Sequence, residues 1–67
     1  MSLTYQQRRV LDKLRDRIKN GMNYNFASDL AMWLSIPAPS VRRTIAELRT
    51  MGYPITSTTT RGYHIKN

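Results

Sequence analysis

Apolar residues near the start of the chain recur at the spacing of one helical face. The residues that share this face are Val10, Leu11, Leu14 and Ile18. This periodicity is typical of an amphipathic helix that packs one side against a core. Thr4 and Gln7 stand three residues apart before the pattern, a spacing at which each can cap the backbone of the other, and Gly21 is placed to end the helix. The pattern predicts a helix over residues 4–19.

A second, shorter apolar pattern covers residues 26–34. Its apolar residues lie on one side of a short helix: Phe26, Leu30, Ala31, Trp33 and Leu34. Before it, residues 21–26 alternate asparagine with aromatic side chains, as in a brief extended segment, and Asn25 is placed to cap the helix. Large aromatic side chains in such a helix are usually buried, so Phe26 and Trp33 are predicted to lie in the core.

Pro37 and Pro39 separate this helix from the next. A residue that precedes proline is driven away from helical backbone angles, so no helix crosses this point. Proline is tolerated in the first turn of a helix, where its missing N–H would have had no partner, and Pro39 therefore fits the start of a new helix. The apolar residues that follow share one face: Val41, Ile45, Leu48 and, at its margin, Met51. With Gly52 as a stop signal, the pattern predicts a helix over residues 38–51.

The last part of the chain, GYPITSTTTRGYHIKN, has the composition of a β-hairpin. Pro54 ends any helix, residues 55–58 and 63–65 are rich in β-branched and aromatic side chains, and residues 59–62 can turn between them. A hairpin this short is marginal alone and needs support from the helices. The side chains expected to pack on them are Ile55, Tyr63 and Ile65. The fold class predicted is therefore α+β, with three helices followed by a C-terminal hairpin.

Composition narrows the class of protein. The 67 residues are predicted to form one domain, residues 1–67, and they include no cysteine and one histidine, so a disulfide framework is excluded and a structural zinc site has almost no ligands. No apolar run approaches the about 18 residues of a membrane span, and the N-terminus lacks the apolar core of a signal peptide. A cytoplasmic protein that makes no membrane contact and needs no metal or cofactor is expected.

The charge balance suggests a polyanionic partner. Eleven Lys and Arg residues stand against four Asp and Glu residues, a formal net charge of +7. The alternative is a solubilising surface. The charges of residues 4–19 are interpreted in that second way, because Asp12 and Asp16 offer ion-pair partners at helical spacing.

Two short helices joined by a tight turn, the second with a polar face, form an arrangement that reads the major groove of DNA. The candidate DNA-binding residues of the second helix are Ala38, Pro39, Ser40, Arg42, Arg43 and Glu47. Either arginine can pair with a guanine or hold a phosphate. Ser40 can contact DNA or satisfy its own helix terminus. Glu47 can accept from a cytosine or pair with Arg43, and the ion pair is favoured.

The predicted hairpin supplies a second set of candidates. Its tip carries Thr58, Thr59, Thr60 and Arg61. Hydroxyls and an arginine at an exposed tip suit contact with phosphate or with the minor groove, and an ordinary exposed turn is the alternative. His64 has no evident catalytic partner and is interpreted as a strand residue.

The segment DLAMWLSIPAPSVRRTIAELRTMGYPI, followed by TRGYHI, resembles the winged helix-turn-helix domain of the biotin repressor and of DeoR-like transcription factors. The likeness covers residues 26–65, and it implies that residues 38–51 form the recognition helix and that Arg61 is the wing arginine. Pro37 stands where the family commonly has a serine cap, and Ser35 where glycine is common. The chain also resembles small standalone regulators of bacteriophages and prophages.

The expected function is sequence-specific binding of double-stranded DNA by a small transcriptional regulator in the bacterial cytoplasm or nucleoid. A module of this size buries only about 600–1,000 Å² on DNA, so a homodimer or cooperative array is expected, with the first helix or the surface around Tyr5 as the contact. The alternatives are a protein-interaction module that inhibits or recruits a host factor, a recombination directionality factor, and a duplex-RNA binder. No enzyme is expected, because the acidic residues show neither metal-ligand spacing nor a nucleophile-base pairing.

Overall fold

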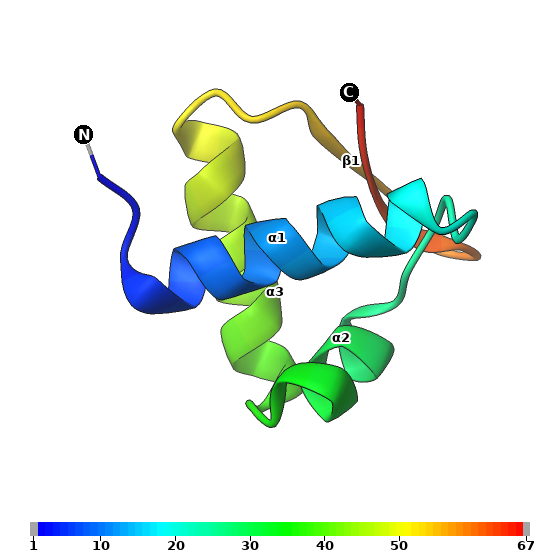
Figure 1. Ribbon diagram of the computed structural model, residues 1–67, viewed down its shortest axis with the longest axis horizontal. Coiled ribbons are helices and arrows are strands. Elements are labelled where there is room, and N and C mark those ends of the chain that lie inside the picture. The colour runs from blue at the N-terminus through cyan, green and yellow to red at the C-terminus, as the bar shows by residue number, and fades with distance from the viewer. Residues whose placement is uncertain (1, 67) are drawn as a thin grey trace.

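The structure, a computed structural model, describes residues 2–66 as three α-helices followed by a two-stranded antiparallel sheet (Figure 1). The elements are α1 (Tyr5–Lys19), α2 (Ala27–Leu34), α3 (Ala38–Thr50), β1 (Ile55–Thr58) and β2 (Gly62–Ile65). In Figure 1, α1 crosses α3, α2 lies beside the first turns of α3, and the hairpin lies beside the C-terminal end of α1. This α+β layout confirms the predicted order of elements and matches the shape of a winged helix domain.

One apolar core is shared by all five elements. Its buried members are Val10, Leu11, Leu14, Ala27, Leu30, Leu34, Val41, Ile45, Leu48, Ile55 and Ile65. Most of the predicted apolar faces of α1 and α3 lie in this core, and α1 contacts α2, α3 and β2. Ile18 packs only partly against it, and Met51, predicted at the margin of the α3 face, is the C-cap of α3 and is 40% exposed. Burial of the core side chains is the main favourable term in the stability of the domain.

Both ends of α1 are closed by the residues expected from the sequence. The hydroxyl of Thr4 accepts a hydrogen bond from the backbone N–H of Gln7 at 3.1 Å, and the Gln7 side chain accepts from the N–H of Thr4 at 3.0 Å. At the other end Gly21 has φ +94°, and the N–H of Met22 donates to the carbonyl of Arg17 at 2.9 Å. This is the Schellman arrangement, which satisfies the last carbonyls of a helix.

In the turn between α2 and α3, Pro37 and Pro39 separate the two helices, as the sequence predicted. Pro37 is the N-cap of α3 with extended backbone angles, Ala38 is the first helical residue and Pro39 the second. Pro37 has no side-chain cap to offer, and its carbonyl accepts from the N–H groups of Ser40 at 3.0 Å and Val41 at 3.1 Å. Both prolines therefore sit where the lack of an N–H costs the helix little.

Three expectations for α2 are wrong. Phe26 is 43% exposed and Trp33 is 38% exposed, so neither belongs to the core. An eight-residue helix buries one narrow side, and here Ala27, Leu30 and Leu34 occupy it. The Trp33 ring instead lies beneath cations of α1, with the Arg17 guanidinium carbon 4.2 Å from its centroid.

The third expectation concerned Asn25, which does not cap α2. The N-cap is Phe26, and the side chain of Asn25 donates to the carbonyl of Met22 at 2.9 Å. Asn25 is buried because its backbone pairs with Tyr63 of β2, through bonds of 2.9 and 2.7 Å. The segment before α2 thus adds a short extended bridge to the sheet, as its alternating pattern indicated.

The hairpin lies where the sequence predicted it. Ile55 pairs with Ile65 at its base and Thr58 pairs with Gly62 near its tip. Both isoleucines are buried, and Tyr63 packs partly against the core. The hairpin is therefore anchored at its base while its polar tip projects from the domain. Within residues 2–66, none of the helices combines the length and the apolar character that crossing a bilayer requires.

Candidate nucleic-acid interface

The exposed face of α3 is set by the side that α3 buries. Val41, Thr44, Ile45 and Leu48 are buried against the rest of the domain. Because consecutive helical residues point about 100° apart, Arg42 and Arg43 are turned away from this side. Both are exposed. The two arginines singled out in the sequence are thus neighbours on the outer surface of α3.

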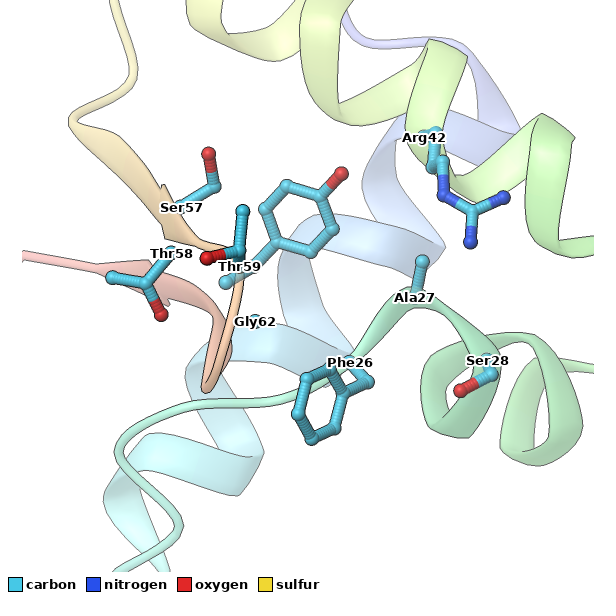
Figure 2. Close-up of a pocket in the computed structure, with 9 residues that line it drawn as sticks. Phe26, Ala27, Ser28, Arg42, Ser57, Thr58, Thr59 and Gly62 are labelled. Atoms are coloured by element: carbon cyan, nitrogen blue, oxygen red, sulfur yellow. The ribbon is translucent and has the colours of Figure 1, made fainter.

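Arg42 lies on the side of α3 that faces the wing, the name used here for residues 55–65. It lines a pocket of about 290 Å³ between α3, the wing and the start of α2. The other lining residues are Phe26, Ala27, Ser28, Ser57, Thr58, Thr59, Gly62 and Tyr63. Figure 2 shows the Arg42 guanidinium extending from α3 toward Ala27 and Ser28, with the wing hydroxyls across the pocket. The structure thereby brings Arg42 and Thr59, two predicted site residues, to one pocket.

Arg43 lies on the opposite side of the same helix face. It borders a shallow depression lined also by Gln7, Ala46, Glu47, Thr50 and Met51. The carboxylate of Glu47 accepts a hydrogen bond from Gln7 Nε2 at 3.2 Å. The favoured pairing of Glu47 with Arg43 is not formed among the described residues. Glu47 is instead tied to α1, which leaves the Arg43 guanidinium exposed to an incoming ligand.

The first turn of α3 holds the remaining helix candidates. Ala38 and Ser40 are half-buried, and Pro39 is exposed. No side chain caps the helix start, so the interpretation of Ser40 as a cap of its own helix is not found. Pro39 carries no N–H, and the N–H of Ser40 is bonded to Pro37. The start of α3 therefore offers fewer free backbone donors than an ordinary helix terminus.

The tip of the wing carries the last candidates. Thr59, Thr60 and Arg61 are all exposed. The backbone N–H of Arg61 donates to Thr58 Oγ1 at 2.9 Å, which closes the turn. The Arg61 guanidinium carbon lies 5.6 Å from the centroid of the Tyr24 ring, and Arg61 does not line the Arg42 pocket. The wing thus presents two separate polar sites, the Thr58–Thr59 side and the Arg61 side.

Some residues of this surface were not expected from the sequence. Ala27 and Ser28 reach the pocket from α2, and Ser57 reaches it from β1. The packing of α2 against α3 brings Ala27 and Ser28 near Arg42, and the fold of the wing brings Ser57 there. The one available signal was Ser28, a polar residue in the first turn of a predicted helix.

One acidic side chain, Glu47, lies on the exposed face of α3 beside Arg43 and is bonded to Gln7. Asp29 lies in the first turn of α2, and Asp12 and Asp16 lie on α1. Among the described residues no group of three or more His, Cys, Asp or Glu side chains comes together as a metal site.

Models of known protein families give no match to the chain, and a search of curated proteins finds no relative.

Proposed function

We propose that the chain binds double-stranded DNA in a sequence-specific manner through the exposed face of α3 and the wing, and that it acts as a small transcriptional regulator. The observation that carries this proposal is the pair Arg42 and Arg43, exposed side by side on a helix whose opposite side is buried in the core. A net charge of +7 adds a long-range attraction toward a polyanion.

The mechanism is occupancy of a DNA site. The major groove of B-form DNA is about 12 Å wide and admits one α-helix, so α3 can enter it with its first turns foremost. An arginine there can pair with guanine O6 and N7 through two hydrogen bonds. The wing then lies along the backbone or in the neighbouring minor groove, where Thr60 and Arg61 supply polar contacts. Once bound at its operator, the protein excludes or recruits other proteins without any chemical step.

A single copy gives limited specificity, because a module of this size covers about 600–1,000 Å² on DNA. A homodimer or a cooperative array on repeated half-sites is therefore part of the proposal. Half-sites about one helical turn apart would place two copies on one face of the duplex. The exposed ring of Tyr5, 79% exposed, is the candidate contact on α1.

The salt dependence of binding tests the proposal. The affinity for duplex DNA is measured between 50 and 200 mM salt, with a duplex RNA of the same sequence as the comparison. Binding that neutralises phosphates predicts a slope of about −0.9 in log affinity against log salt concentration for each phosphate contacted. RNA is expected to bind more weakly, because its deep and narrow major groove does not admit α3. A slope near zero, or equal binding of RNA, contradicts the proposal.

A protein-interaction module is the second candidate function. The observation that favours it is the exposed apolar surface of α2, where Met32 is 68% exposed beside Trp33. Apolar side chains at a surface often mark contact with another protein. The same salt titration separates the two functions, because an apolar protein contact is little affected by salt.

A further inference from the structure

The pocket beside Arg42 has a donor set that suits an anion. Arg42 is the one cationic side chain in its lining, and none of the described residues that line it is a carboxylate. The hydroxyl groups around it belong to Ser28, Ser57, Thr58, Thr59 and Tyr63. Guanidinium and hydroxyl groups donate hydrogen bonds to phosphate oxygens, and charge-assisted bonds from arginine are the stronger ones.

Backbone donors on one wall add to this set. Phe26, the N-cap of α2, makes no side-chain cap, and within residues 2–66 the N–H groups of Ala27 and Ser28 have no hydrogen-bond partner. Both residues line the pocket that Arg42 enters (Figure 2). The first turn of a helix favours negative charge, so these N–H groups add to the attraction of the Arg42 guanidinium for an anion.

The two arginines of α3 face different surroundings. Arg42 shares its pocket with the hydroxyls of the wing and the free N–H groups of α2, whereas Arg43 borders the depression with Gln7 and Glu47 on the other side. A carboxylate near Arg43 disfavours a phosphate there, while it is compatible with base edges, which present both donors and acceptors. The surroundings of Arg42 therefore suit a phosphate, and those of Arg43 suit the edge of a base pair.

We propose that the pocket holds one backbone phosphate of duplex DNA, so that Arg42 positions the protein on the duplex and Arg43 reads a base pair. This inference rests on the proposed function. The pocket, of about 290 Å³, has room for a phosphate group.

Substitution of each arginine by lysine and by glutamine tests the division. Lysine still neutralises a phosphate as a point charge, but it cannot make the paired bonds to guanine. We therefore expect Arg42→Lys to bind like the wild type. Arg42→Gln is expected to lose affinity by a similar factor on all sequences, with the salt slope reduced by about one. Arg43→Lys and Arg43→Gln are both expected to lose about 5- to 150-fold on the preferred site and to relax the preference at one base pair.

The measurements are binding curves for the four variants on the preferred duplex, taken from a selection with random duplex DNA, and on a scrambled duplex. The melting curve of each variant checks that it folds. If Arg42→Lys is as damaging as Arg42→Gln and relaxes one base pair, Arg42 reads a base and the inference fails while the proposed function stands. If the wild type binds no duplex, the proposed function fails and this inference with it.

A titration with inorganic phosphate identifies the source of the phosphate group. Amide resonances of Ser28 and Thr58 are followed at constant ionic strength, first with inorganic phosphate and then with duplex DNA. Saturation by DNA at micromolar concentration, with only weak shifts from millimolar phosphate, supports a backbone phosphate. Saturation by micromolar inorganic phosphate without a response to DNA would assign the pocket to a free anion and overturn the inference.

Discussion

The guanidinium group of Arg49 donates a hydrogen bond from Nε to the main-chain carbonyl oxygen of Ile55 over 2.9 Å. A second nitrogen, Nη2, donates to Ser57 Oγ at 3.3 Å. Arg49 belongs to the last turn of α3, and Ile55 begins β1, so one side chain joins the helix to the wing. The distance between Arg42 and the wing hydroxyls therefore depends on an arginine that is itself engaged within the protein.

Replacing Arg49 by Lys should loosen this joint. Lysine keeps the charge but lacks the guanidinium nitrogens that reach both acceptors, so we expect a loss of about 1 kcal/mol in the free energy of unfolding. DNA affinity should fall without a change in the preferred sequence. Urea unfolding and a binding curve measure both effects, with Arg8→Lys, exposed on α1, as the matched control. Equal unfolding midpoints for the two variants would show that the Arg49 bonds do not support the domain.

Gly62 is required by space as well as by backbone angle. It has φ +94°, and a Cβ at this position would lie 2.6 Å from the carbonyl carbon of Asn25 and 2.7 Å from the nitrogen of Phe26. Gly52 has φ +102° with nothing within 4 Å, so it is the matched control. We expect Gly62→Ala to cost about 1 to 3 kcal/mol more than Gly52→Ala in urea unfolding, because it adds overlap to the same strain. Equal losses in the free energy of unfolding for the two variants would contradict a steric requirement for glycine at position 62.

Ser35 ends α2 in the left-handed region with φ 57°, the position at which the resembled family commonly has glycine. Left-handed backbone angles are unfavourable for a residue with a Cβ, so Ser35→Gly should raise the free energy of unfolding by about 0.5 to 1 kcal/mol. For a domain of this size the melting temperature should rise by about 2 to 8 °C. Ser28→Gly, inside α2 and without positive φ, is the control and should lower it. A lower melting temperature for Ser35→Gly would contradict the reason given.

Leu48→Ala should largely unfold the domain. Leu48 is fully buried, and its truncation is expected to cost about 2 to 5 kcal/mol. A core of this size supplies only about 3 to 5 kcal/mol in total, so little would remain. Circular dichroism against urea concentration measures the loss. Met51→Ala, at a side chain that is 40% exposed, should cost less than about 1 kcal/mol. Similar losses in the two variants would show that Leu48 is not a central core residue.

The sequence predicted those elements that depend on local chemistry. Thr4 and Gln7 cap α1, and Pro39 opens α3, because capping and proline effects act within a few residues of the chain. The buried face of α3 followed from its period for the same reason. The predicted arginines of α3 are exposed as a consequence of that face.

The sequence predictions failed where contacts between distant parts of the chain determine the position of a residue. Trp33 is adjacent to the buried Leu34, yet its ring lies at the surface beneath Lys13 and Arg17 of α1, a contact that no local pattern specifies. Asn25 has the chemistry of a cap, but its pairing with Tyr63 uses its backbone in the sheet. The pocket near Arg42 likewise joins three separate parts of the chain, which no local pattern specifies.

A nuclear magnetic resonance titration shows whether α3 and the wing together contact duplex DNA. A duplex carrying the selected site is added to the isotope-labelled protein at near-physiological salt, and the guanidinium and amide resonances of Arg42, Arg43 and Arg61 are followed. We expect all three to shift and saturate together as the complex forms. Arginine resonances that stay unmoved while the duplex is in excess would contradict it.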